Sequence, residues 1–225
     1  MELTRESIQS GAYLRSFVDL PGQPRWPRER ILAALHDALS RRPPGQPLWL
    51  FAYGSLIWNP LFRYAERQSA VLHGWQRRFC LRLLAGRGTP EQPGRMLALD
   101  AGGGCAGMAF RLSESGLDDE LALVSIRELP YGSYRIIWRE VKLADRRRVP
   151  ALAFVANPAQ RQYAADASIA TVAPLVARAR GPMGSNAQYL FQLEDALARH
   201  GYSDPHVDAL AAAVRKERPD RQSRP

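Results

Sequence analysis

The chain has 225 residues, of which 46% are hydrophobic and 24% are charged, and its formal net charge is +9. These values are typical of an ordinary folded protein and exclude a fibrous or a wholly disordered one. The charge would suit nucleic acid, but it is spread along the chain as arginine and no nucleic-acid-binding motif accompanies it, so we expect no nucleic-acid partner.

Membrane insertion, metal binding and a disulfide framework are also not expected. No apolar run reaches the roughly 18 residues that cross a bilayer, and the charged first 25 residues lack the apolar region of a signal peptide. Cys80 and Cys105 lie in apolar runs, which is typical of buried thiols. The histidines lack metal-ligand spacing and there is no phosphate-binding loop. We therefore expect a cytoplasmic protein without metal or cofactor.

The N-terminal part divides at a proline-rich linker. Residues 1–24 are weakly patterned and form an arm that either packs or frays. Pro27, followed by apolar residues at helical spacing, predicts a helix that ends before residues 41–47. We therefore separate an N-terminal arm and helix, residues 1–47, from a main domain at residues 48–214.

The central stretch of the chain is an unbroken apolar run, Leu48 to Tyr53, which predicts a strand buried on both faces. It ends at Gly54-Ser55. Gly54 can adopt positive φ and has no Cβ, so the N–H groups of this turn can converge on an anion, with the Ser55 hydroxyl as a further donor. The alternative, which the pattern alone favours, is an ordinary buried strand that ends in a Gly-Ser turn.

Apolar segments of strand length follow at the spacing of a curved sheet or a small barrel. Gly102 to Gly104 has the composition of a hairpin turn, and we expect it to join two of these strands. The expected strands cover residues 71–75, 78–83, 96–99, 105–112, 134–143 and 149–155.

A helix expected from Gly116 to just before Pro130 carries a second chemical candidate, Glu128. Its apolar residues repeat at i, i+4 and i+7 and define a core-facing stripe: Leu117, Leu121 and Val124. Eleven residues at about 100° each place Glu128 within roughly 20° of Leu117, on this stripe. Burial and the negative end of the helix would both raise the pKa of this carboxyl, as suits a general acid or base. The alternatives are an ion pair with a nearby arginine and a helix end turned outward.

Further helices follow towards the C-terminus, over residues 166–180, after Ser185 and after Asp204. Tyr189 shares a helix face with apolar residues, so the pattern alone favours a core side chain over a ligand contact. Residues 215–225 have no apolar side chain, and we expect a basic, disordered tail.

Several stretches, taken in order from about residue 48 to 200, together resemble one protein family. They are Phe51 to Pro60, Gly74 to Cys80, Gln92 to Leu99, Arg127-Glu128 with Tyr134, and Gly181 to Phe191. Tyr53-Gly54-Ser55-Leu56 is similar to the Tyr-Gly-Ser-Leu signature of the γ-glutamylcyclotransferase superfamily, and its context is similar to the ChaC branch.

The resemblance implies an α+β fold, a mixed β-barrel or curved sheet with flanking helices. It also implies a cofactor-free reaction in which the α-amine of a γ-glutamyl substrate attacks its own γ-carbonyl and releases 5-oxoproline. In the ChaC branch the substrate is glutathione and the other product is Cys-Gly. Glu128 then acts as general acid and base, and the substrate-binding residues are Tyr53, Gly54, Ser55, Leu56, Ile57, Tyr134 and Tyr189.

Two other functions stay open from the sequence. One is a cyclotransferase for a different γ-glutamyl amine or dipeptide. The other is a non-catalytic regulator of cation transport, although we expect such a protein to have lost Glu128, which this chain retains. The sequence indicates neither the leaving group nor the oligomeric state.

Overall fold

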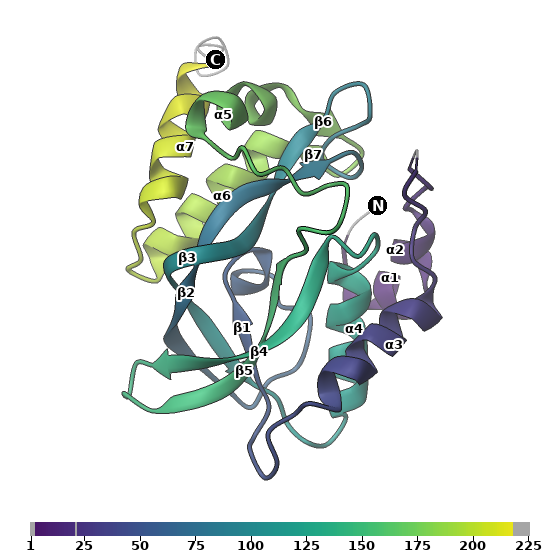
Figure 1. The fold of residues 1–225 in the computed structure, drawn as a ribbon, viewed down its shortest axis with the longest axis vertical. Coiled ribbons are helices and arrows are strands. Elements are labelled where there is room, and N and C mark those ends of the chain that lie inside the picture. The colour runs from purple at the N-terminus through teal and green to yellow at the C-terminus, as the bar shows by residue number, and fades with distance from the viewer. Residues whose placement is uncertain (1–2, 21, 218–225) are drawn as a thin grey trace.

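A closed barrel of five strands lies between two groups of helices in the computed structural model, which describes residues 3–20 and 22–217 (Figure 1). The strand order is β1-β3-β2-β4-β5, and β5 closes the barrel by parallel pairing with β1 and β3, while the other pairs are antiparallel. The strands are β1 (Trp49–Ala52), β2 (Glu66–Leu83), β3 (Gly94–Arg111), β4 (Tyr134–Leu143) and β5 (Arg148–Ala156). This confirms the expected α+β fold with a mixed barrel.

The expected strand at the centre of the chain is β1. Each of its residues is at most 1% exposed, because β3 and β5 pair with it on either side and side chains cover both of its faces. The chain leaves β1 through Tyr53 and Gly54 into a single turn of 3₁₀ helix, η1 (Ser55–Ile57).

The expected hairpin at Gly102 to Gly104 is wrong. These glycines lie inside β3, which runs unbroken beside β2, and the segments 71–75 and 78–83 are both parts of β2. The pairing shifts register between His73 and Trp75, where Gly74 has φ 77°, and Gly102 and Gly103 opposite have φ 118° and 59°. The glycines therefore serve a bulge that bends a long hairpin, whose actual loop is residues 84–93.

The first helical layer consists of α1 (Arg5–Gln9), α2 (Ala12–Arg15), α3 (Arg28–Leu39) and α4 (Leu117–Glu128). The helix α4 is buried on both sides, because the three earlier helices contact the side that faces away from the barrel. Arg5 forms an ion pair with Glu120 of α4 at 2.5 Å. The described part of the N-terminal arm thus packs against the main domain.

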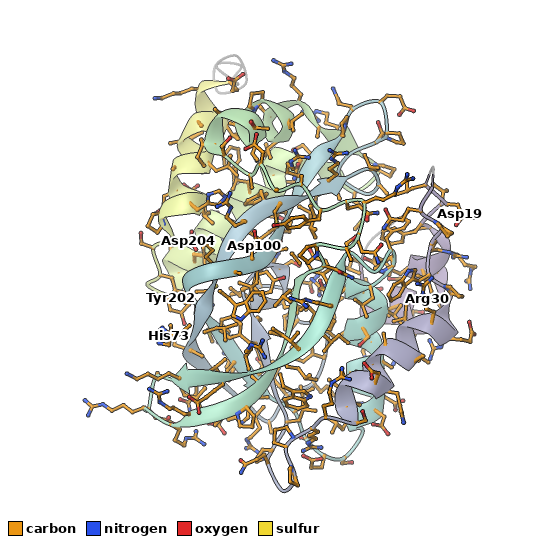
Figure 2. All side chains as sticks on the ribbon, in the orientation of Figure 1. Asp19, Arg30, His73, Asp100, Tyr202 and Asp204 are labelled. Atoms are coloured by element: carbon orange, nitrogen blue, oxygen red, sulfur yellow. The ribbon has the colours of Figure 1, made fainter. Side chains whose placement is uncertain are left out.

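The second helical layer consists of α5 (Ile169–Arg178), α6 (Asn186–Arg199) and α7 (Pro205–Lys216), with a short ribbon of β6 (Arg180–Gly181) and β7 (Gly184–Ser185). Ser185 caps α6 and Asp204 caps α7, as expected. Asp204 lies on this side of the barrel and Asp19 and Arg30 on the opposite side (Figure 2).

Two expectations concern the chain's C-terminus and membrane insertion. The expected tail starts at residue 215, whereas α7 continues to Lys216, and residues 218–225 lie outside the described residues. None of the helices in the described ranges combines the length and apolar character needed to cross a membrane.

Candidate active site

A cavity of about 640 Å³ lies where the turn after β1, the end of α4 and the helix α6 meet. It brings together most of the residues that the sequence singled out: Tyr53, Gly54, Ser55, Leu56, Glu128, Tyr134 and Tyr189. Ile57 is different, since it is 4% exposed, packs into the core and does not line the cavity.

Glu128 is the last residue of α4, and its side chain is 16% exposed. Its carboxylate Oε1 lies 3.2 Å from Nε of Arg127. Burial raises the pKa of Glu128 above the ordinary value, although the Arg127 charge opposes this rise. The carboxyl is therefore ion-paired and its pKa is raised, which confirms the expected ion pair with an arginine, while the role of Glu128 as general acid and base stays a prediction.

Three tyrosines line the cavity together with this carboxylate, of which Tyr53 and Tyr189 are buried and Tyr134 is partly buried. The hydroxyl of Tyr53 donates to the Phe154 carbonyl at 2.7 Å, and that of Tyr134 donates to the Leu97 carbonyl at 2.7 Å. Burial and the negative charge of Glu128 raise the pKa of both, and they raise the pKa of Tyr189 to about 12. All three are thus neutral phenols near pH 7, and two of them are fixed by backbone acceptors.

The turn at Gly54 does not use positive φ, which corrects one expectation: its φ is −131°. Glycine is required here by close packing instead, since a Cβ would lie 3.0 Å from the Tyr189 hydroxyl and 3.2 Å from a Leu97 methyl. The next N–H groups, of Ser55 and Leu56, open η1, and no backbone carbonyl of residues 3–20 and 22–217 accepts from them. The Ser55 N–H donates to the Tyr189 hydroxyl oxygen instead, so of the two groups the Leu56 N–H is the one without a partner among the described residues.

Arg127 is a functional candidate that our assignment of site residues missed. Its side chain is 3% exposed, and besides Glu128 it contacts Ser55 Oγ at 2.8 Å and the Asn59 carbonyl. It therefore links the carboxylate to the turn. The sequence feature that could have identified it is its position directly before Glu128 in one of the stretches that carry the family resemblance. Arginine is common throughout this chain, so the residue type alone does not distinguish Arg127.

The charged residues that line the cavity are three arginines and one carboxylate: Arg82, Arg87, Arg127 and Glu128. This balance favours an anionic ligand. No group of His, Cys, Asp and Glu side chains among the described residues is arranged to hold a metal ion.

Known proteins resemble this chain in sequence and in fold. The model of the ChaC-like protein family matches residues 48–217. A glutathione-specific γ-glutamylcyclotransferase of Escherichia coli (strain K12) is 42% identical over 95% of this chain and 93% of its own length. γ-Glutamylcyclotransferase 2-3 of Arabidopsis thaliana is 33% identical over 75% of this chain and 88% of its own. A solved yeast γ-glutamyl cyclotransferase specific to glutathione shares the fold, with a TM-score of 0.71, 22% identity and coverage of 77% of this chain and 98% of that one.

Proposed function

Since the chain belongs to the ChaC family, we propose that it is a γ-glutamylcyclotransferase that degrades glutathione to 5-oxoproline and Cys-Gly. The names of the relatives support the substrate. The observation that carries the proposal within this chain is Glu128, a carboxylate of raised pKa in a cavity that the turn at Ser55 and Leu56 also lines.

The turn after β1 binds the α-carboxylate of the γ-glutamyl group in this proposal. The N–H group of Leu56 donates to it, and such a charge-assisted bond is strong. The Ser55 oxygen already accepts from Arg127, so its own O–H is available as a further donor. The Arg127 charge balances the added carboxylate.

Glu128 then transfers the two protons that the reaction must move from the attacking to the departing nitrogen. It removes a proton from the substrate's α-ammonium, and the free amine attacks the γ-carbonyl carbon. A new C–N bond closes the five-membered ring while the bond from the γ-carbon to the cysteine nitrogen breaks. The proton on Glu128 passes to that departing nitrogen. Glu128 then takes the second proton from the ring nitrogen and passes it on as well, so that 5-oxoproline keeps one N–H and Cys-Gly leaves with its amine as an ammonium. Because the nucleophile belongs to the substrate, the enzyme mainly has to hold amine and carbonyl in contact.

The neutral phenols of Tyr53, Tyr134 and Tyr189 shape the walls around the reacting atoms. They add no charge that would compete with Glu128 for the ammonium.

The proposed chemistry needs proton transfer and positioning alone, so we expect a cofactor-independent enzyme. Dialysis against EDTA should leave the rate of 5-oxoproline release unchanged, and restoration of a lost rate by a divalent ion would contradict this mechanism. The buried free thiols Cys80 and Cys105 suit a reducing cytoplasm.

A cyclotransferase for another γ-glutamyl amine is the second candidate. The turn and Glu128 address the γ-glutamyl half, which every such substrate shares, and so do not by themselves select the leaving group. The test is to measure kcat/KM for glutathione and for a panel of γ-glutamyl dipeptides, with Glu128→Gln as the inactive control. We expect glutathione to be preferred. Preference for a dipeptide would favour the second candidate, and no 5-oxoproline from any compound would refute both.

A further inference from the structure

The N-terminal segment, residues 3–20, supplies part of the wall of the active-site cavity. This segment precedes residues 48–217, which the family model matches. Four of its side chains nevertheless line the same cavity as Glu128: Leu3, Tyr13, Phe17 and Leu20. All four are apolar or aromatic, in contrast to the charged residues elsewhere on the wall.

The segment is fastened to the stretch of chain that carries Glu128. The Tyr13 hydroxyl donates to the carbonyl of Arg127 at 3.2 Å, one residue before Glu128. In the opposite direction, the hydroxyl of Tyr131 donates to the Val18 carbonyl at 2.8 Å. The Phe17 ring lies between these two tyrosines, edge to face, with centroid distances of 5.0 Å to Tyr13 and 5.6 Å to Tyr131.

A further bond extends this attachment beyond the segment itself. The N–H of Trp26 donates to the Pro130 carbonyl at 2.7 Å, just after the end of α4. Asp19 and Arg30, which flank this region in the chain, lie on the α4 side of the barrel (Figure 2). The end of α4 is thus held from outside by residues that the barrel does not provide.

The titratable groups that interact with the Glu128 carboxylate come from every element around it. They are Arg127 of α4, Tyr53 after β1, Tyr134 of β4, Tyr189 of α6 and Tyr13 of α2. Of these, Arg127 is the one charged partner, and it stabilises the ionised carboxylate. If Glu128 is to act near neutral pH, the rise in its pKa that exclusion of water causes must therefore exceed the fall that the Arg127 charge causes.

We propose that residues 3–20 are a positioning wall of the active site, in which Tyr13 fixes the end of α4 and Phe17 keeps water from the Glu128 carboxylate. The importance of this wall for catalysis rests on the proposed function. Its exclusion of water from the Glu128 carboxylate does not. Neither Tyr13 nor Phe17 takes part in the proton transfers themselves.

The test is a titration of the Glu128 carboxyl by carbon NMR in protein labelled with ¹³C-glutamate, the signal being assigned by its loss in Glu128→Gln. The full chain is compared with Phe17→Ala and with the matched control Val18→Ala, whose side chain is 66% exposed. We expect the Glu128 midpoint to fall by about one pH unit in Phe17→Ala, because water reaches the carboxylate. It should stay unchanged in Val18→Ala.

An unchanged Glu128 midpoint in folded Phe17→Ala would overturn the proposal. If Phe17→Ala does not fold, Phe17→Leu takes its place, with a smaller fall expected and the same overturning result. Because the titration needs no substrate, a fall in a protein that releases no 5-oxoproline refutes the proposed function and supports the wall. In an active parent, the acid limb of kcat/KM should move to lower pH in Phe17→Ala. An active parent whose Glu128 midpoint does not respond refutes the wall alone.

Discussion

The two helical layers on either side of the barrel contribute differently to the cavity. The N-terminal layer delivers the ionisable group, Glu128, at the end of α4 and lines the same cavity with Tyr13 and Phe17. The C-terminal layer delivers a neutral phenol, Tyr189, and its Asp204 pairs with Arg77 of β2, which binds the turn after β1. In the proposed reaction, one layer therefore supplies the group that transfers protons, and the other shapes the binding site.

Arg77 shows how the C-terminal layer reaches the turn. Its side chain is 1% exposed, and its Nε donates to the Tyr53 carbonyl at 2.7 Å, directly before Gly54. The same guanidinium pairs at 2.9 Å with Asp204, which also caps α7. Changes in the N-terminal layer should therefore alter turnover, whereas changes in the C-terminal layer should alter stability or binding.

The largest effect is expected at the end of α4. Glu128→Gln keeps the shape of the side chain but cannot accept the ammonium proton, so kcat should fall about 10²–10⁴-fold. Glutathione binding, measured by calorimetry, and the thermal unfolding midpoint should stay close to those of the parent. A variant that keeps more than about a tenth of the parental kcat would move the base to another residue.

Gly54→Val tests the turn itself. The new Cβ would lie 3.0 Å from the Tyr189 hydroxyl, so either the turn or α6 must shift away from the bound carboxylate. Calorimetric titration in the Glu128→Gln background, where substrate does not turn over, should detect no glutathione binding. The matched control is Gly104→Val in β3, where a Cβ meets ordinary contacts at 3.8 Å. Equal affinity in Gly54→Val and its parent would place the carboxylate site elsewhere.

Asp204→Ala separates stability from chemistry. It leaves the buried Arg77 guanidinium without its ion pair and α7 without its cap, so the free energy of unfolding should fall by about 3–5 kcal/mol. Denaturant unfolding measures this fall, with Asp208→Ala on the same helix as control. The kcat of the folded enzyme should change less than about tenfold, well short of the general-base effect at Glu128. A loss of kcat as large as that of Glu128→Gln would remove the distinction between the layers.

The smallest effect is expected from Ser55→Ala, where the layers meet. The change removes one donor to the substrate carboxylate and one acceptor of Arg127, but it leaves every backbone N–H in place. Binding of glutathione should weaken by about 1–2 kcal/mol in the same calorimetric assay. Complete loss of detectable binding in Ser55→Ala would show that the hydroxyl, and not the backbone, carries the binding.

The sequence predicted the two parts of the site that depend on local patterns. The apolar run into Gly54 marked β1 and its turn, and helical spacing placed Glu128 on the buried side of α4. The substrate-binding roles of Tyr53, Tyr134 and Tyr189 stay predictions, although all three line the cavity. Ile57 was chosen because it follows the signature, and sequence adjacency does not decide which way a 3₁₀ side chain points.

Other features depended on contacts that no local pattern encodes. A run of glycines at 102–104 is compatible with a hairpin turn and with a bulge. The pairing of β3 with β2 decides between the two. The N-terminal arm looked weakly patterned because α1 and α2 are only 5 and 4 residues long. Its contribution to the cavity appears once α4 is in place, since Tyr13 and Phe17 contact residues more than a hundred positions later.

The most direct test of intramolecular cyclisation is the product analysis of glutathione degradation in water enriched in ¹⁸O. Attack by the substrate's own amine predicts equimolar 5-oxoproline and Cys-Gly, with no ¹⁸O in either product by mass spectrometry. Glutamate carrying one ¹⁸O, with 5-oxoproline absent, would mean that water is the nucleophile, and it would contradict the role given to Glu128.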